Sequence, residues 1–315
     1  MIENWLTRTF SLTVPVVGAP MAGPGEGRLA AAVSAAGGLG MVGVHASRSA
    51  EWVHEQAAVA AAPGRSYGIG LMAWALDRDD RQLDAVQELR PSLVSVSFGN
   101  IEPYVERLRA AGIPVAVQVG DSAEAVRAEA AGADLVVARG GEGGGHGRND
   151  VGTLPLLQAV LDRVEVPVVA AGGIGTARGL AAVLAAGAVG AWVGTALLTA
   201  QEAGTSQRAR ARLLAADETS TAYGRVFDVA QRLSWPEEYG GRALRNEYFD
   251  RWADRLDELS AEHEAARQLA EARAAEDYDT AYVYAGQGVG LLREERSVGD
   301  VLTELARAEE LLRRW

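Results

Sequence analysis

Short apolar runs alternate with Ala-rich amphipathic segments along the first two thirds of the chain, with a period of roughly 20 to 30 residues. This alternation predicts repeated βα units and a parallel sheet. We expect eight strands, at residues 14–19, 39–42, 66–71, 93–97, 114–119, 135–138, 166–170 and 191–193. Eight parallel strands of this kind close into a (β/α)8 TIM barrel, so the predicted fold class is α/β.

Glycine residues follow several of the predicted helices and come just before the next strand. They occur in AAGGLG at 35–40, RAAGIP at 109–114 and AAGADL at 130–135. Glycine just beyond a helix C-terminus adopts the left-handed conformation that ends the helix. These positions therefore predict the αβ turns of the barrel.

The pattern changes near residue 201, where segments rich in Arg, Glu and aromatic residues begin and no strand pattern returns before Tyr282. We expect a barrel domain made of residues 1–203 and 286–315, with the last helix at 291–315. Residues 204–285 are expected to form a helical insertion, a lid or substrate domain over the mouth of the barrel. The turn AGQGVG at 285–290 is expected to return the chain to the site.

Composition excludes several classes of function. The net charge of −12 argues against a nucleic acid or an anionic membrane as partner. The chain has no Cys and no Lys, which removes thiol chemistry and Schiff-base catalysis, and no metal site is expected. No run of 18 apolar residues and no signal peptide is recognised, so the expected location is cytoplasmic. A homodimer is left open.

The loop VVARGGEGGGHGR at 136–148 is the strongest candidate for a site. Its six glycines let the backbone approach a ligand closely, which an ordinary surface loop does not need. His146 is the natural general base there, because the pKa of an imidazole lies near neutrality. Glu142 either orients His146 or hydrogen-bonds the loop backbone. His45 follows a strand and either lines the pocket or has a structural role, whereas His54 and His263 are expected on the surface.

Small and polar residues follow the other predicted strands, where a barrel carries its active site. Glycine turns after the seventh and eighth strands favour a phosphate held by backbone N–H groups. The expected cofactor contacts are Ala19, Pro20, Met21, Gln118, Arg139, Gly144, Gly145, Ala171, Gly172, Gly173, Gly194, Thr195 and Gln287. The expected substrate contacts are His45, Ser97, Gly99, Glu142 and Gly288.

The segments GAPMAG, GGEGGGH, PVVAAGGI, GLAAVLAAGAVGAWVGTALL and AGQGVG occur in an order that resembles the nitronate monooxygenase family. The resemblance covers nearly the whole chain and implies an FMN-dependent barrel with a helical lid. It also implies that His146 is the catalytic histidine and that Gly173, Gly194 and Thr195 hold the FMN phosphate.

The chain departs from the family pattern at two positions. Arg139 stands where the family usually has Gln and sometimes Asp, and Gly143 where it has Ala or Cys. Arg139 would either stabilise an anionic substrate or reduced flavin, or turn away and pair with Glu142.

The activity implied by the resemblance is oxidation of alkyl nitronates by O2 to a carbonyl compound and nitrite, without NAD(P)H. A neutral nitroalkane would first lose its α-proton to His146. The alternative is an NAD(P)H-dependent flavin reductase of enoyl thioesters or quinones, since enoyl-ACP reductases of the same barrel family carry a similar Gly-Gly-His stretch. A member recruited to a biosynthetic oxidation, or a non-catalytic flavin-binding protein on a degenerate barrel, would also fit the pattern.

Overall fold

Eight parallel strands form a barrel in the computed structural model, which describes residues 2–62 and 64–314. The strands are β1 (Val16–Gly18), β2 (Gly40–Gly43), β3 (Tyr67–Met72), β4 (Leu93–Ser97), β5 (Val115–Val119), β6 (Leu135–Arg139), β8 (Val168–Ala171) and β9 (Gly190–Val193). Their order is β1-β9-β8-β6-β5-β4-β3-β2. The barrel closes beside β1, where Leu39 N–H donates to the Val16 carbonyl over 2.9 Å. All eight predicted strands are present, and the predicted fold class is confirmed.

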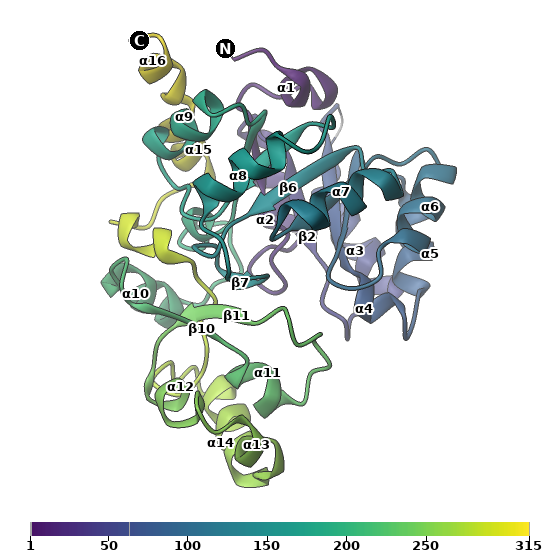
Figure 1. The fold of residues 1–315 in the computed structure, drawn as a ribbon. Helices are drawn as coiled ribbons and strands as arrows, with labels where there is room; N and C mark the ends of the chain where they lie inside the picture. Colours follow the sequence, from purple (N-terminus) through teal and green to yellow (C-terminus); the bar gives the residue numbers. More distant parts are fainter. Residues whose placement is uncertain (1, 63, 315) are drawn as a thin grey trace.

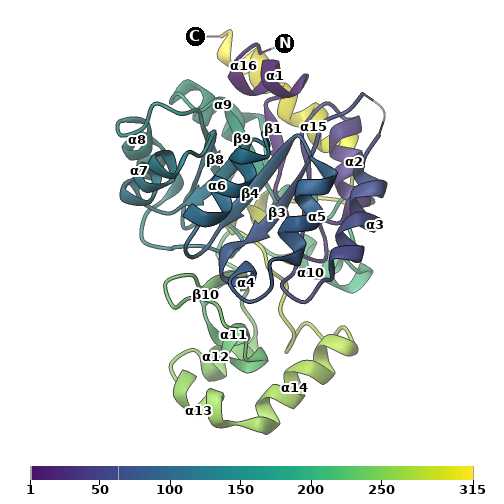
Figure 2. The same ribbon diagram turned by 90° about the vertical axis from the view of Figure 1, so that its right-hand side faces the viewer.

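Helices surround the strands on the outside of the barrel (Figures 1 and 2). They are α2 (Gly27–Ala35), α3 (Ala50–Ala60), α5 (Arg81–Leu89), α6 (Glu102–Ala110), α7 (Ser122–Ala131), α8 (Thr153–Leu161), α9 (Ala177–Ala185) and α15 (Val298–Ala306), with the short α4 (Ala73–Leu76) and α16 (Ala308–Leu312). The single helix expected at 291–315 is therefore shorter and divided in two. No described helix is both long and apolar enough to cross a membrane.

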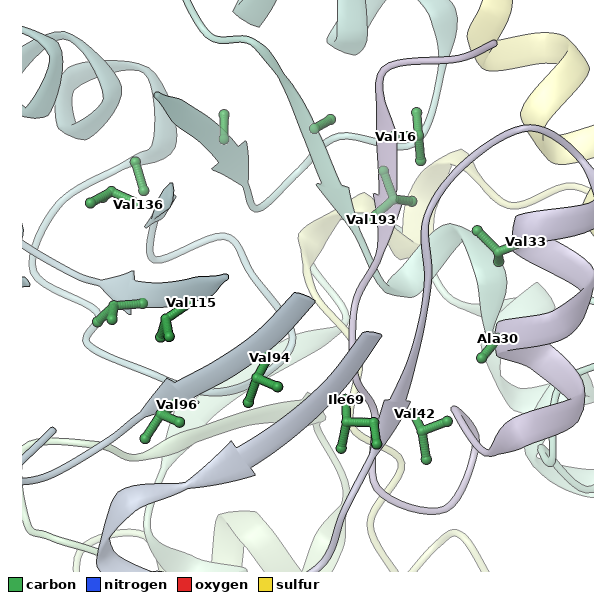
Figure 3. Close-up of a cluster of buried hydrophobic side chains, with 14 of the residues drawn as sticks. Val16, Ala30, Val33, Val42, Ile69, Val94, Val96, Val115, Val136 and Val193 are labelled. Carbon is green, nitrogen blue, oxygen red and sulfur yellow. The ribbon is translucent and has the colours of Figure 1, made fainter. Parts of the chain in front are cut away.

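Alternate residues of each strand enter two separate cores, because successive side chains of a strand point to opposite faces. Val16, Val136 and Val168 pack outward against the helices, in a cluster of which Figure 3 labels Val16 and Val136. Their neighbours Val17 and Val137 point into the barrel. Both faces of each strand are thus buried, which explains the continuous apolar runs in the sequence.

The interior of the barrel is closed at its N-terminal end by helix α1 (Trp5–Phe10). Leu6 and Phe10 of this helix are buried against inward-facing residues such as Leu39, Leu93 and Leu135. The side chain of Asn4 caps α1 by accepting a hydrogen bond from Thr7 N–H. Packing at this end leaves the C-terminal end of the strands for the site.

Residues 204–285, here called the insertion, lie below the C-terminal ends of the strands in both ribbon views. It contains α10 (Gln207–Ala215), β10 (Thr221–Gly224), α11 (Val226–Gln231), β11 (Gly241–Leu244), α12 (Glu247–Trp252), α13 (Leu256–Ala261) and α14 (His263–Ala274). It lies between two 3-10 helices, η1 (Thr195–Leu197) and η2 (Gln287–Leu291). Its own apolar core includes Phe227, Tyr248, Phe249, Trp252 and Leu269.

The two strands of the insertion correct the expectation that no strand precedes Tyr282. β10 and β11 pair antiparallel, and β11 also pairs with β7 (Gly145–His146), which belongs to the Gly-rich loop of the barrel. In the sequence, Tyr223 of β10 is flanked by small and polar residues that do not alternate with apolar ones as in a typical strand. The hydrophobic pattern alone therefore did not predict these strands. Their pairing joins the insertion directly to the loop that carries His146.

Candidate active site

A cavity of about 560 Å³ lies at the C-terminal end of the barrel, between the barrel loops and the insertion. This volume is within the range of cofactor and small-molecule sites. Most of the residues predicted to form the site line it, and they come from seven of the eight strand ends together with η2. They are Ala19, Pro20, Met21, His45, Ser97, Gln118, Arg139, Gly144, Gly145, His146, Ala171, Gly172, Gly173, Gly194, Thr195 and Gly288.

Three predicted contact residues do not line this cavity: Gly99, Glu142 and Gln287. Gly99 has a φ of 120° and serves the turn between β4 and α6. The Glu142 carboxylate accepts hydrogen bonds from the backbone N–H and the hydroxyl of Thr153, each over 2.8 Å. The Glu142 carbonyl accepts from Gln287 N–H. Glu142 therefore hydrogen-bonds the backbone, which is one of the two roles left open by the sequence, and Gln287 helps to hold it there.

Glycine turns after β8 and β9 form a concave backbone surface on one wall of the cavity. Gly172 and Gly173 have φ angles of 109° and 71°, which L side chains rarely adopt. A Cβ at Gly194 would lie 3.4 Å from both Ala19 and Met21, so glycine keeps the space between these loops open. The Thr195 hydroxyl accepts a hydrogen bond from Gly286 N–H over 2.9 Å, which ties η2 to this wall. Exposed backbone N–H groups at such turns suit a phosphate.

His146 is held by the insertion. Its backbone belongs to β7, opposite Gly241 of β11. Its Nε2 lies 2.9 Å from Oδ1 of Asp228, a carboxylate of α11 that is only 2% exposed. The hydroxyl of Tyr284 donates to the same oxygen over 3.5 Å. Burial, followed by the charge of Asp228, raises the pKa of Tyr284 well above its usual value, so this hydroxyl stays protonated.

The imidazole of His146 also stacks on the indole of Trp235. The ring centroids are 3.7 Å apart and the planes are inclined by 1°. Trp235 in turn packs against Trp74 and Phe98 of the barrel, so an aromatic wall links the insertion to the loops after β3 and β4. Stacking and the Asp228 contact together fix the plane of the His146 ring.

The second ring nitrogen of His146, Nδ1, has no hydrogen-bond partner among the described residues, and it is not a buried atom. Because His146 lines the cavity, Nδ1 is the nitrogen left for a ligand. When Nε2–H donates to Asp228, the lone pair of the ring lies on Nδ1. The second nitrogen can then accept a hydrogen bond from a ligand.

Arg139 lies under the Gly-rich loop and is 3% exposed. Its guanidinium donates to the carbonyls of Gly143, Gly145 and Arg148 over 2.5 to 2.9 Å, while its Nε has no partner among the described residues. Burial lowers the pKa of Arg139 to about 10, so it remains charged at neutral pH. The hydrogen bonds of Arg139 go to the loop carbonyls, and none goes to Glu142. Arg139 also lines the cavity, so its positive charge lies at the cavity wall.

Arg242 of β11 holds the same loop from the side of the insertion. Its Nε donates to the Gly141 carbonyl over 2.7 Å and its guanidinium also donates to the Asn149 side chain over 2.6 Å. Two buried arginines thus fix the loop by binding its carbonyls, which explains how a segment with so many glycines keeps one conformation.

Sequence reasoning missed Asp228, Trp235 and Tyr284 as parts of the site. One feature could have indicated Asp228, since it is a single carboxylate in the otherwise apolar segment VFDVA at 226–230. A charged residue on the buried face of a helix needs a partner. The described residues contain no cluster of three or more His, Cys, Asp or Glu side chains that could hold a metal ion.

Comparison with known protein families identifies related proteins. A family model described as nitronate monooxygenase matches residues 45–308. A nitronate monooxygenase of Neurospora crassa is 34% identical over 66% of this chain and 57% of that protein. A carboxyl-CoA dehydrogenase of Rhodococcus jostii that acts on an octahydroindene substrate is 34% identical over 72% of this chain and 64% of that protein. The chain thus spans less than two thirds of the length of these two relatives.

Solved structures with the same architecture cover almost the entire chain. FabK from Thermotoga maritima has a TM-score of 0.85 and 26% identity, covering 100% of this chain and 98% of its own. A nitroalkane oxidase from Streptomyces ansochromogenes has a TM-score of 0.83 and 30% identity, covering 98% of this chain and 99% of its own. The similar proteins therefore include enzymes with different reactions on one barrel.

Proposed function

The chain belongs to the nitronate monooxygenase family, a family of flavin-dependent oxidoreductases, and on that premise we propose that it oxidises alkyl nitronates with O2 at an FMN bound in the cavity. The overall reaction balances when two nitronates and one O2 give two carbonyl compounds and two nitrite ions. The insertion acts as a lid over this reaction. Nitroalkanes are substrates when His146 first converts them into nitronates.

The cavity fits FMN by the chemistry of its walls. Gly172, Gly173, Gly194 and Thr195 would receive the phosphate through backbone N–H groups, and the positive φ angles of Gly172 and Gly173 require glycine in this turn. Met21 and the loop glycines Gly144 and Gly145 line the part of the cavity that suits a flat ring. Bound FMN supplies the electron acceptance that no side chain of this chain can provide. The charge of Arg139 on the wall favours anionic ligands in the same space.

The observation that carries the proposal is the contact between His146 and Asp228. Nε2 lies 2.9 Å from Oδ1 of Asp228 and donates its hydrogen bond there, which leaves the lone pair of Nδ1 for a ligand in the cavity that His146 lines. In this position Nδ1 accepts the α-proton of a nitroalkane, and Asp228 stabilises the imidazolium that results. Once it has taken the proton, the charged His146 donates a hydrogen bond from Nδ1 to the nitro group of the nitronate that has formed. A substrate that is already a nitronate needs no such proton transfer.

The first experiment is a visible spectrum of the purified protein followed by kinetic assays with ethylnitronate and nitroethane. We expect flavin absorbance bands and nitrite release with O2 uptake from ethylnitronate. Replacing His146 by Ala should lower nitroethane turnover by a hundredfold or more, about the contribution of a general base, and should spare ethylnitronate. A His146→Ala enzyme with full nitroethane turnover would refute the role of His146. A colourless protein that takes up no FMN would refute the cofactor.

An NAD(P)H-dependent reductase of thioesters or quinones is the second candidate, and the dehydrogenase relative that acts on a carboxyl-CoA supports it. Anaerobic mixing with NADPH separates the two functions. Rapid and complete bleaching of the flavin bands by NADPH alone would favour the reductase, whereas flavin that ignores NADPH but reacts with ethylnitronate supports nitronate oxidation.

A further inference from the structure

A second cavity, here called the outer cavity, lies against the first and has a volume of about 580 Å³. It is formed by α11 and α14 of the insertion and by the loop after β2. The two cavities share His45, Gln231, Leu233 and Arg273 in their walls. The outer cavity is therefore adjacent to the cavity that His146 lines.

The walls of the outer cavity are basic, although the chain as a whole is acidic. Two arginines, Arg232 and Arg273, and two histidines, His45 and His263, line it, and none of the described lining residues is acidic. The chain contains 42 acidic residues against 30 basic ones. Because the overall charge is −12, a cavity with two arginines and no carboxylate among its described lining residues is the opposite of what composition predicts.

The two guanidinium groups keep most of their donors free. Arg232 bonds Nδ1 of His263 over 2.8 Å, and Arg273 donates to Oε1 of Gln231 over 2.7 Å and lies 5.0 Å above the ring of Tyr282. Neither has an ion pair with a carboxylate among the described residues. Each guanidinium has five N–H donors in a planar fork, so several remain for a ligand.

His45 experiences the same crowding of positive charge. Its pKa is lowered first by burial and then by the charges of Arg48, Arg273 and His146. Its Nδ1 accepts a hydrogen bond from Ser47 N–H over 3.2 Å, which leaves Nε2 as a donor. An anion in the outer cavity would offset this mutual repulsion, because opposite charges attract.

We propose that the outer cavity binds a phosphate-bearing part of a ligand whose reacting end lies in the inner cavity, with Arg232 and Arg273 as its main contacts. The arginine fork matches phosphate oxygens in pairs, and two forks from different helices suit a diphosphate. A nicotinamide nucleotide and a coenzyme A thioester both carry this group. The inference goes beyond nitronate oxidation, since an alkyl nitronate carries no phosphate, and it rests on the proposed function only in placing the reacting end beside His146.

The test is calorimetric titration of the FMN-loaded protein with inorganic pyrophosphate at low ionic strength. FMN occupies the inner phosphate site, so added pyrophosphate reports on the outer cavity. We expect saturable binding to one site that weakens as salt is added. Replacing Arg273 by Gln should weaken it about tenfold, the usual worth of a charge-assisted hydrogen bond. Absence of saturable binding to the wild-type protein would overturn the inference.

Replacing Arg273 removes packing contacts as well as a charge. A second variant therefore tests the same cavity with the Arg273 side chain in place. Ala270 is an exposed residue of α14 that lines the outer cavity, so Ala270→Glu adds a carboxylate without removing a contact. It should weaken pyrophosphate binding by tenfold or more through charge repulsion. The matched controls are Gln268→Glu and Arg267→Gln on the same helix, outside the cavity lining. Binding that both controls reduce as strongly as Ala270→Glu would contradict the proposed position.

Two further titrations, with NADPH and with coenzyme A, identify the source of the phosphate by asking which affinity Arg273→Gln reduces. Nitrite release from ethylnitronate is measured on the wild-type protein in parallel. If the wild-type protein binds pyrophosphate but releases no nitrite, the proposed function is refuted and the phosphate site stands. If it releases nitrite but does not bind pyrophosphate, the phosphate site is refuted and the proposed function stands.

Discussion

At the scale of single residues, the two departures from the family pattern, Arg139 and Gly143, belong to one packing arrangement. A Cβ at Gly143 would lie 2.6 Å from Nε of Arg139, and one at Gly147 would lie 2.9 Å from its Cζ. The Arg139 side chain fills the space under the loop that an Ala or Cys at position 143 would need. Because Arg139 is held by several loop carbonyls, it cannot move aside without losing these hydrogen bonds.

This coupling predicts a non-additive pair of mutations. Gly143→Ala should destabilise the protein by about 1–3 kcal/mol, the usual cost of overpacking. In an Arg139→Gln background, the same Gly143→Ala substitution should cost much less, because the shorter side chain leaves room for the methyl group. Denaturant unfolding of the two single variants and the double variant measures the coupling energy. Additive losses would contradict the packing explanation.

The contact between His146 and Asp228 gives a second prediction at this scale. Asp228→Asn can donate to Nε2, which places the ring proton on Nδ1 and removes the base from the cavity. We expect nitroethane turnover to fall by about a hundredfold or more, while ethylnitronate turnover changes little. The deuterium isotope effect with α-deuterated nitroethane should increase. A general loss of folding would instead lower both activities together, so the ratio of the two separates positioning from structure.

At the scale of elements, strand β11 connects the insertion to the active-site loop. It pairs with β10 on one side and with β7 on the other, and Arg242 reaches from it under the loop. Gly241 lies directly opposite His146. A Cβ there would lie 2.7 Å from the Tyr284 ring and 3.4 Å from Nε2 of His146. The close approach of β11 to the base therefore requires glycine.

Gly241→Ala should consequently disturb the site without touching the cofactor walls. We expect a loss of about 1–3 kcal/mol in stability from overpacking, together with reduced nitroethane turnover as His146 is pushed from Asp228. Thermal unfolding and the nitrite assay measure the two effects. Gly299→Ala in α15 is the control, because a Cβ there would make only an ordinary contact, 3.6 Å from Ser297. Equal effects of the two substitutions would argue against a special role of β11.

At the scale of the whole molecule, the barrel and the insertion contribute different parts of one site. The barrel supplies the glycine turns and the floor of the cavity, and the insertion supplies Asp228, Trp235 and one wall of the outer cavity. The insertion has its own apolar core, and the aromatic wall around Trp74 and Trp235 joins it to the barrel. A ligand between them contacts both parts at once.

Cofactor binding should therefore stabilise the molecule, and the phosphate should account for much of the effect. Ligand at one hundred times its dissociation constant adds about 2.7 kcal/mol to the free energy of unfolding. We expect the melting temperature of the flavin-free protein to rise steadily with FMN concentration. Riboflavin, which lacks the phosphate, should raise it much less at equal concentration. Equal shifts by the two flavins would contradict a phosphate site at Gly172, Gly173, Gly194 and Thr195.

The sequence alone determined the barrel and its strands to within two residues, and most of the site residues that it predicted, including His146, line the cavity. These features depend on local patterns, because strand periodicity and glycine turns place residues at strand ends whatever the rest of the chain does. Only the tertiary structure revealed the partner of His146, since Asp228 lies 82 residues further along the chain. It also decided that the Arg139 guanidinium bonds the loop carbonyls and that scattered arginines and histidines share an outer cavity. Such contacts depend on how the insertion folds back over the barrel, and no spacing in the sequence encodes that path.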